Sequence, residues 1–349
     1  MSWMIYGANG YTGELIAREA VARGMTPILA GRSKAKVERL AHELKLECRI
    51  FDLDSTAGIA AQLKGLKAVL LTAGPFSATS QPMVQACIQA GAHYLDITGE
   101  IDVFEQVFRR DADARKAGVV LCPGVGFDVI PTDCVAAALK EALPDAVELH
   151  LGFDTTVSLS PGTMKTTLES APQGGRVRRD GKLIHVPLAH EVRRIDFGRG
   201  ERLAVAVPWG DVSTAFHTTG IPNITVFVPG SRVSIFGMKL GNLFGPLMKL
   251  PAVQRMLAAL VTKTVKGPDE VARAGMPAYV WGEAINARGE RRIARVKTSN
   301  GYSLTIPGSL AVLNHLLTHD APAGFTTPSR LVGSNLLSQL PGGADILID

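Results

Sequence analysis

Cysteine is scarce in this sequence, and its positions match no metal or redox motif. The four residues, Cys48, Cys87, Cys122 and Cys134, show no C-x-x-C spacing and no paired histidine, which argues against a zinc site and against a redox dithiol. We therefore expect no bound metal. The apolar stretch at residues 4–6 is too short for the core of a secretory signal and runs directly into glycines, so we expect a cytoplasmic location.

Long apolar runs and dense basic runs are also missing. No uninterrupted apolar segment reaches the roughly 18 residues of a membrane-spanning helix, so none is expected. Lysine and arginine are scattered rather than interleaved with aromatics, which argues against a nucleic-acid partner, although the net charge of +5 is compatible with an anionic ligand. The 349 residues, 46% hydrophobic and 20% charged, predict a globular chain of two domains.

Short apolar runs alternate with amphipathic helical patterns over the first 125 residues. The expected strands cover residues 3–6, 27–30, 49–53, 67–72, 93–97 and 119–122. The first expected helix ends at Gly24. The others cover residues 34–45, 56–64, Pro82 to Gly91, and 102–117. This alternation indicates βαβ units and a parallel sheet. The predicted fold class is α/β, with a Rossmann-type domain over residues 1–125.

The turn between the first strand and the first helix is rich in glycine. Gly7 permits a tight turn, Gly10 lets the backbone approach a pyrophosphate, and Gly13 allows close packing of the helix, whose N-terminus faces the negative charge. Their G-x-x-G-x-x-G spacing is a variant common among NADP enzymes. Such a turn can be purely structural, but its place as the first βα turn favours a dinucleotide site. The predicted cofactor-binding residues of this turn are Gly7, Asn9, Gly10, Tyr11, Thr12 and Gly13.

The end of the second expected strand distinguishes NADP from NAD. An NAD enzyme usually places an acidic residue there to hold the ribose 2′-hydroxyl, whereas this sequence has Arg32 followed by Ser33. A guanidinium can bind a 2′-phosphate through two parallel hydrogen bonds, and the serine hydroxyl can donate beside it. The alternative is a solvated arginine at a helix start. We expect NADP(H), with Asp52 after the third strand accepting from the adenine amino group.

From the fourth expected strand onward, the sequence resembles the saccharopine dehydrogenase-like oxidoreductases. Seven segments carry the resemblance: Thr72–Phe76, Tyr94–Glu100, Gly124–Asp133, Pro208–Ala215, His217–Asn223, Trp281–Ala284 and Gly324–Pro328. It is closest to the branch of trans-acting enoyl reductases, which act on polyketide and lipid intermediates. The resemblance implies that Ala73, Gly74, Pro75 and Phe76 pass under the nicotinamide. It leaves the substrate open, because the family also includes imine-forming amino-acid enzymes.

The pattern changes after residue 125. Strand-like segments at 147–155, 201–207, 224–228, 278–287 and 291–298 predict an α+β substrate domain over 126–310, with a mixed or antiparallel sheet. Residues 179–182 indicate a hairpin turn, and the Arg176, Arg178 and Arg179 cluster beside it is expected to be exposed. Helices at 308–318 and 329–338 are expected to return the segment 311–349 to the Rossmann domain.

Reduction by a nicotinamide usually needs a proton donor. No tyrosine is followed four residues later by lysine, which excludes the short-chain dehydrogenase arrangement. The catalytic candidates are His217, Asp211 and Asp128, with Asp133 and Glu100 as further acid–base residues. His217 is favoured because histidine titrates near neutrality, and the alternative for each residue is a structural role. Lys165 is a candidate contact for an anionic substrate.

Residues 232–268 combine six basic residues with many apolar ones and contain no acidic residue. This composition fits a peripheral membrane contact, a lid over a hydrophobic substrate, or a helical pair in a homodimer interface. The leading functional hypothesis is NADPH-dependent reduction of a C=C or C=O bond in a hydrophobic small molecule. The alternatives are an amino-acid dehydrogenase that forms or cleaves a C–N bond, and an NADP(H)-sensing protein without turnover.

Overall fold

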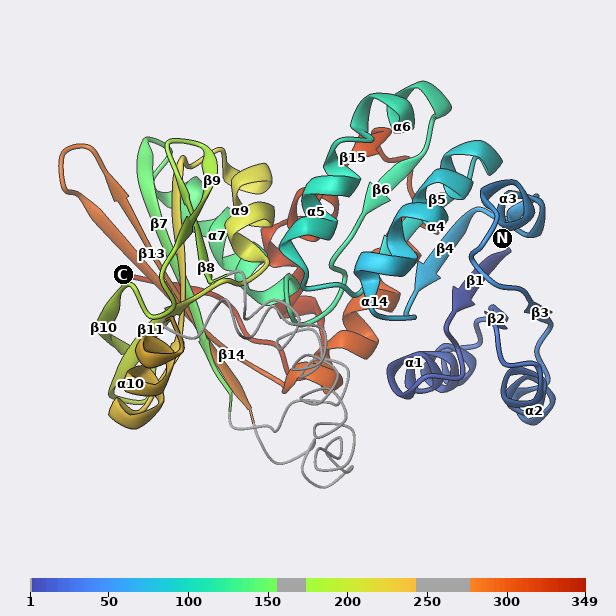
Figure 1. Cartoon of the computed structure of the whole chain (residues 1–349), viewed down its shortest axis with the longest axis horizontal. Coiled ribbons are helices and arrows are strands. Elements are labelled where there is room, and N and C mark those ends of the chain that lie inside the picture. Colours follow the sequence, from blue (N-terminus) through green and yellow to red (C-terminus); the bar gives the residue numbers. More distant parts are fainter. Residues whose placement is uncertain (1, 156–173, 243–276) are drawn as a thin grey trace. The chain divides into compact units, whose positions relative to one another are not determined.

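The computed structural model describes residues 2–155, 174–242 and 277–349 (Figure 1). Lys165 and residues 243–268 of the basic, apolar segment lie outside the described residues. Of the described helices, none is long and apolar enough to cross a membrane.

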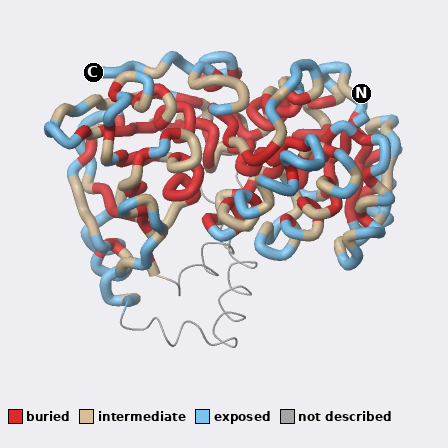
Figure 2. The backbone as a smooth tube through the Cα atoms, turned by 90° about the horizontal axis from the view of Figure 1, so that it is seen from above, coloured by how far each residue is buried: buried red, intermediate tan, exposed pale blue. Residues whose placement is uncertain are grey.

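The chain divides into two compact units. Unit 1 comprises Met1–Ile130 and Tyr302–Leu336, and unit 2 comprises Pro131–Gly301 and Leu337–Asp349. The first boundary lies a few residues beyond the expected residue 125. The last residues of the chain lie with unit 2 rather than with the Rossmann domain, because their strand pairs with a strand of unit 2. In each unit the buried residues lie along the inner stretches of the chain, and exposed residues lie around them (Figure 2).

Unit 1 is built on a parallel sheet whose strands follow the apolar runs of the sequence. The strands are β1 (Trp3–Tyr6), β2 (Ile28–Gly31), β3 (Cys48–Ile50), β4 (Ala68–Leu71), β5 (His93–Asp96), β6 (Val120–Cys122) and β15 (Gly324–Phe325). Their order across the sheet is β15-β6-β5-β4-β1-β2-β3, and every pairing is parallel. This is the strand order of a dinucleotide-binding fold with β15 added at one edge, so the predicted Rossmann-type sheet is confirmed.

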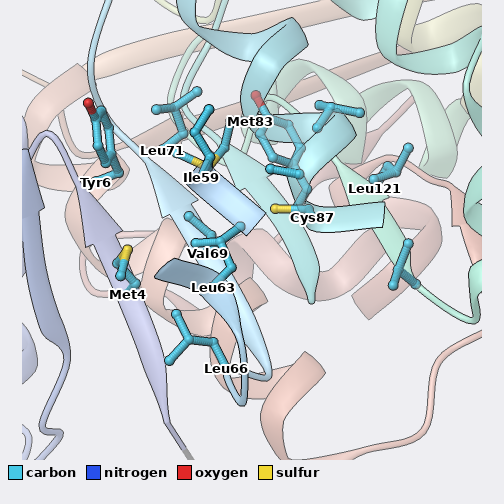
Figure 3. Close-up of a cluster of buried hydrophobic side chains, with 14 of the residues drawn as sticks. Met4, Tyr6, Ile59, Leu63, Leu66, Val69, Leu71, Met83, Cys87 and Leu121 are labelled. Atoms are coloured by element: carbon cyan, nitrogen blue, oxygen red, sulfur yellow. The ribbon is translucent and has the colours of Figure 1, made fainter. Parts of the chain in front are cut away.

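Helices cover both faces of this sheet, which explains why the strands are continuous apolar runs rather than alternating ones. The helices are α1 (Tyr11–Ala22), α2 (Lys34–Leu44), α3 (Thr56–Leu63), α4 (Phe76–Ala90), α5 (Ile101–Phe108), α6 (Asp111–Ala117), α14 (Gly301–Thr318) and α15 (Pro328–Val332). Helices α3 to α6 lie on one face, and α1, α2 and α14 lie on the other (Figure 1). On the first face, Met4 and Val69 of the sheet belong to one buried cluster with Leu63 and Cys87 (Figure 3).

Two helices of unit 1 differ from the prediction. Helix α4 begins at Phe76 and contains Pro82 in its interior, so the expected start at Pro82 is wrong. The carboxylate of Glu100 accepts hydrogen bonds from the backbone amides of Phe76 (2.9 Å) and Ser77 (2.8 Å), which fixes the true start. The single helix expected at 102–117 is instead two helices, α5 and α6, separated at residues 109–110.

Unit 2 is built on a mixed sheet. Its strands are β7 (Ala146–Asp154), β8 (Gly175–Arg179), β9 (Lys182–Val186), β10 (Val192–Asp196), β11 (Glu201–Val207), β12 (Asn223–Pro229), β13 (Ala278–Asn286), β14 (Arg291–Thr298) and β16 (Leu347–Ile348). The order is β10-β11-β12-β7-β13-β14-β16, and β8 pairs with β12 and β9. Strands β12 and β7 are parallel, whereas the other pairs are antiparallel, so the predicted mixed sheet is confirmed.

The strand expected at 147–155 is present as β7, and it is buried over most of its length. Helix α7 (Ile130–Ala142) packs against one face of the sheet, where a side chain at Gly282 would meet Val135 and Leu139. On the other face, the ring of Phe197 lies over Gly152. Helices α9 (Asp211–Thr219) and α10 (Arg232–Gly241) and the short 3-10 helix η3 (Ser334–Gln339) complete the described elements.

The β8–β9 hairpin has the predicted turn, with positive φ angles at Asp180 (48°) and Gly181 (74°). The expectation that its arginines are exposed is wrong for Arg178. This side chain is buried, donates to the carbonyls of Val212 and Gly181 at 2.7 Å each, and lies 4.2 Å from the ring centre of Phe216. Arg178 therefore attaches helix α9 to the hairpin.

Candidate nucleotide-binding site

A pocket of about 480 Å³ opens at the carboxyl ends of β1, β2 and β4 in unit 1. The strand order reverses between β1 and β4, and ligands of open α/β sheets bind at such a reversal. The residues that line the pocket are Tyr6, Gly7, Asn9, Gly10, Gly31, Arg32, Ser33, Thr72, Ala73 and Gly74. The sequence predicted seven of these residues and missed Tyr6, Gly31 and Thr72. These three end or directly follow β1, β2 and β4, and that position is the signal that could have identified them.

The glycines of the first turn are required by close backbone contacts. Gly7 has a φ of +90°, and a Cβ there would lie 2.7 Å from the backbone nitrogen of Ala73. A Cβ at Gly13 would overlap the carbonyl oxygen of Gly7 and lie 2.7 Å from the hydroxyl oxygen of Thr72. The turn after β1 therefore lies in close contact with the end of β4, and no side chain fits at Gly7 or Gly13.

The N-terminus of α1 fits a pyrophosphate. Gly10 is the N-cap and has no side chain with which to cap the helix, while its own amide donates to the carbonyl of Gly7 at 2.9 Å. A ligand phosphate can therefore approach the first-turn amides, where the helix dipole favours negative charge. Tyr11 and Thr12 belong to this first turn but do not line the pocket. The exposed ring of Tyr11 instead meets Tyr302 edge to face, with ring centres 5.3 Å apart.

The wall formed by Arg32 and Ser33 fits a phosphate group separate from the pyrophosphate. Ser33 is the N-cap of α2, yet its hydroxyl makes no capping hydrogen bond. The first turn of α2 contains no acidic residue, and Arg32 beside it is exposed. The guanidinium, the serine hydroxyl and the helix N-terminus together suit a 2′-phosphate. This is the arrangement expected for NADP(H) rather than NAD(H).

Asp52 does not line the pocket. It is exposed, and its carboxylate accepts a hydrogen bond of 3.2 Å from the backbone amide of Asp54. Ser55, rather than either aspartate, caps α3 by accepting from the amide of Gly58. In this region Tyr6 lines the pocket. Its hydroxyl donates to the carbonyl of Phe51 at 3.0 Å, and burial raises the pKa of Tyr6 to about 12. Tyr6 therefore acts here as a neutral donor.

The loop from Ala73 to Phe76 is held in place by the loop that follows β5, which contains Glu100. Ala73 and Gly74 line the pocket, Pro75 is the N-cap of α4, and Phe76 begins that helix. Both oxygens of Glu100 accept hydrogen bonds from amides of this helix start, as described above, so Glu100 positions the loop. The hydroxyl of Thr79 also donates to the carbonyl of Ala73 at 2.6 Å.

Two aspartates lie at the same edge of the sheet in unit 1. Asp96 is fully buried and accepts from the Tyr94 hydroxyl (2.6 Å) and from the amides of Thr98 (3.0 Å) and Gly124 (2.8 Å). Burial nevertheless raises the pKa of Asp96 to about 6. Asp128 is partly exposed, and desolvation raises its pKa to about 6 as well. The missing side chain of Gly99 makes room for the Asp128 carboxylate.

The remaining candidates lie in unit 2, on helices α7 and α9. Asp211 is the first residue of α9, is fully buried, and accepts a hydrogen bond of 2.6 Å from the hydroxyl of Thr132. Asp133 is also fully buried and accepts from the hydroxyl of Thr218. These contacts favour a structural role for both carboxylates. His217 lies in the last turn of α9; the residue is partly exposed, but the Nε2 atom of its imidazole is buried.

Comparisons with known proteins agree with this geometry. Residues 3–122 match the family model described as the saccharopine dehydrogenase NADP binding domain. The chain is 29% identical over 202 residues to a mouse protein named saccharopine dehydrogenase-like oxidoreductase, covering 50% of this chain and 47% of that one. It is 30% identical over 141 residues to a Mycobacterium bovis protein named trans-acting enoyl reductase, covering 37% and 33%. The matches thus span less than half the length of these curated relatives.

Two solved structures share the fold. The apo saccharopine dehydrogenase (L-Glu forming) of Saccharomyces cerevisiae superposes with a TM-score of 0.68 at 10% identity, covering 100% of this chain and 99% of that one. The homospermidine synthase of Legionella pneumophila, solved in complex with NAD, gives 0.62 at 11% identity, covering 100% and 91%. At these identities the likeness establishes the fold alone. The family match establishes that unit 1 contains an NADP-binding domain, and it confirms the expected cofactor.

Proposed function

We propose that this chain, a saccharopine dehydrogenase-like NADP-binding oxidoreductase, uses NADPH to reduce a C=C or C=O bond of a hydrophobic, lipid- or polyketide-like molecule. The observation that carries the proposal is the pocket in which the glycine turn, Arg32 and Ser33 lie beside Ala73 and Gly74. This pocket can hold the pyrophosphate and the 2′-phosphate of NADPH. When bound, NADPH supplies the hydride, and the residues of the chain bind, orient and shield the reacting groups.

The choice of substrate class draws on unit 2. An enzyme acting on amino acids would need arginines directed at substrate carboxylates. Two of the described arginines of unit 2 are engaged within the unit: Arg178 donates to two backbone carbonyls, and Arg199 pairs with Asp154 at 2.7 Å. These pairings favour an uncharged substrate. The name of the M. bovis relative, trans-acting enoyl reductase, supports the same choice.

The proposal is tested by following NADPH oxidation with three groups of compounds: hydrophobic enones, ketones, and keto acids paired with amines. We expect turnover with an enone or a ketone. Turnover restricted to the keto acid and amine pairs would overturn the proposal in favour of an amino-acid dehydrogenase. Tight NADPH binding without turnover on any compound would instead indicate an NADP(H)-sensing protein.

For the proton donor we propose His217, with Asp128 as the alternative. Replacing His217 by alanine should lower turnover by about 100-fold while NADPH binding is retained, as expected for the loss of a general acid. Asp128→Asn is the paired variant. If Asp128 is the donor, turnover should fall as the pH rises through about 6, and only the Asn variant should lose that dependence. Unchanged turnover in His217→Ala would transfer the role to Asp128.

A further inference from the structure

Within the described residues, helix α10 contacts unit 2 through one side. Its N-cap, Ser231, accepts from the amide of Ser234 at 3.0 Å, so the helix has a defined start. Ile235 is buried against Val205, and Met238 packs on the same cluster. At the other end, the Asn242 side chain accepts from the amide of Leu188 (2.8 Å) and donates to its carbonyl (3.1 Å). The outward orientation of α10 is therefore fixed by contacts within unit 2.

The outward side of α10 is apolar. Val233, Phe236 and Leu240 are spaced three and four residues apart, so they form one stripe, and their exposed fractions are 81%, 68% and 44%. Isolated exposed apolar residues are ordinary, but a contiguous stripe with a phenylalanine at its centre is typical of a surface that binds an apolar partner. In Figure 1, α10 lies at the edge of unit 2 next to β10 and β11.

The charge beside the stripe has one sign. Arg232 and Lys239 are both exposed, and the helix contains no acidic residue. Within the described residues neither cation forms a salt bridge. A soluble surface helix usually mixes Glu with its Lys residues to gain pairs along the helix. The sequence that follows, up to residue 268, adds further basic residues and no acidic one.

The charge beside the stripe also distinguishes between two candidate partners, a second copy of the chain and an anionic bilayer. In a two-fold dimer the same patch meets itself, so Arg232 and Lys239 of one copy would approach those of the other and repel. An anionic bilayer accepts both features together: its headgroups attract the cations, and its acyl boundary takes the Phe and Leu side chains. Complementarity therefore favours a lipid surface.

We propose that α10 is a docking helix that holds the protein on anionic membrane surfaces by inserting Val233, Phe236 and Leu240 at the headgroup boundary. Docking there would give a hydrophobic substrate a short path from the bilayer to the enzyme. Vesicle binding is measured without turnover, so docking can fail while the proposed reaction stands, and the reverse also holds.

The test is co-sedimentation of the full chain with vesicles of phosphatidylcholine alone and of phosphatidylcholine mixed with phosphatidylserine. We expect binding to the mixed vesicles that weakens by about tenfold or more as salt screens the charges. Phe236→Glu should weaken this binding at least about tenfold, because a carboxylate would enter the headgroup boundary. Ile184→Glu, the same kind of change at an exposed residue of β9, should leave binding unaltered.

The cations are tested separately. Replacing Arg232 and Lys239 by alanine should remove the preference for phosphatidylserine, whereas alanine at the exposed Lys182 and Lys297 should preserve it. Equal binding by the wild-type protein and Phe236→Glu would overturn the proposal, as would no binding by the wild-type protein. The proposal would also be overturned if analytical ultracentrifugation showed a dimer that does not bind vesicles and that dissociates in the Phe236→Glu variant.

Discussion

The hydroxyl of Thr132 in α7 donates a hydrogen bond of 2.6 Å to the carboxylate of Asp211 at the start of α9, and both side chains are buried. A second bond crosses the same helix pair in the opposite sense, from the Thr218 hydroxyl of α9 to the Asp133 carboxylate of α7. The two helices are therefore joined by a pair of reciprocal polar bonds. They fix α9, which contains His217 in its last turn, against the helix that begins unit 2.

Removing the donor of the first bond should destabilise the protein without touching the nucleotide pocket. We expect Thr132→Val to lower the free energy of unfolding by about 1–3 kcal/mol, because the buried Asp211 carboxylate loses a donor. Urea unfolding followed by circular dichroism measures this change. Thr318→Val at an exposed helix position should change stability by less than about 0.5 kcal/mol. If the two variants were equally stable, the bond would have no structural importance.

The glycine turn should tolerate no side chain at Gly13. Alanine there would press on the Gly7 carbonyl and the Thr72 hydroxyl, so we expect a loss of about 1–3 kcal/mol in stability and weaker NADPH binding. The matched control is Gly58→Ala in α3, where the new methyl group would make only ordinary contacts at 3.5 Å. That variant should retain NADPH binding and gain up to about 1 kcal/mol from helix propensity. Normal NADPH binding by Gly13→Ala would contradict the described turn.

The buried carboxyl of Asp96 predicts a defined pH dependence. Its pKa is raised from 3.8 to about 6, so the folded state holds a proton that the unfolded chain releases. The corresponding stability, about 3 kcal/mol at most, is complete below pH 4 and is lost as the pH rises through 6. In Asp96→Asn the amide oxygen can still accept from Thr98 and Gly124, and the amide nitrogen can donate to the Tyr94 hydroxyl oxygen.

The measurement for Asp96 compares urea unfolding of the variant and the wild-type protein at pH 4 and pH 7. From pH 4 to pH 7, we expect the free energy of unfolding of Asp96→Asn to fall less, or to rise more, than that of the wild-type protein. The difference between the two proteins is the relevant quantity, because His93 acts in the opposite sense: burial lowers its pKa to about 4. Asp54→Asn, at an exposed aspartate, should follow the wild-type curve. Parallel curves for Asp96→Asn would refute the raised pKa.

The sequence predicted those parts of the molecule that local patterns determine. Continuous apolar runs gave the strands of unit 1, because a parallel sheet covered on both faces needs no alternation. The spacing of Gly7, Gly10 and Gly13 located the phosphate end of the pocket. Arg32 and Ser33 were found from their distance along the chain, since the second strand must end beside the first.

Features that depend on distant residues could not be predicted in this way. Pro82 carries the local signal of a helix start, yet α4 begins at Phe76, because Glu100 caps it from the next loop. The sequence around Arg178 predicts an exposed hairpin, but helix α9 covers the Arg178 side chain.

The central claim is an NADP(H) site whose selectivity resides in Arg32 and Ser33, and titration of the purified protein with NADPH and NADH tests it most directly. The account predicts that NADPH binds at least about tenfold more tightly, a difference of about 1.4 kcal/mol, and that Arg32→Asp removes or inverts the preference. Equal affinities of the unmodified protein for NADPH and NADH would contradict it.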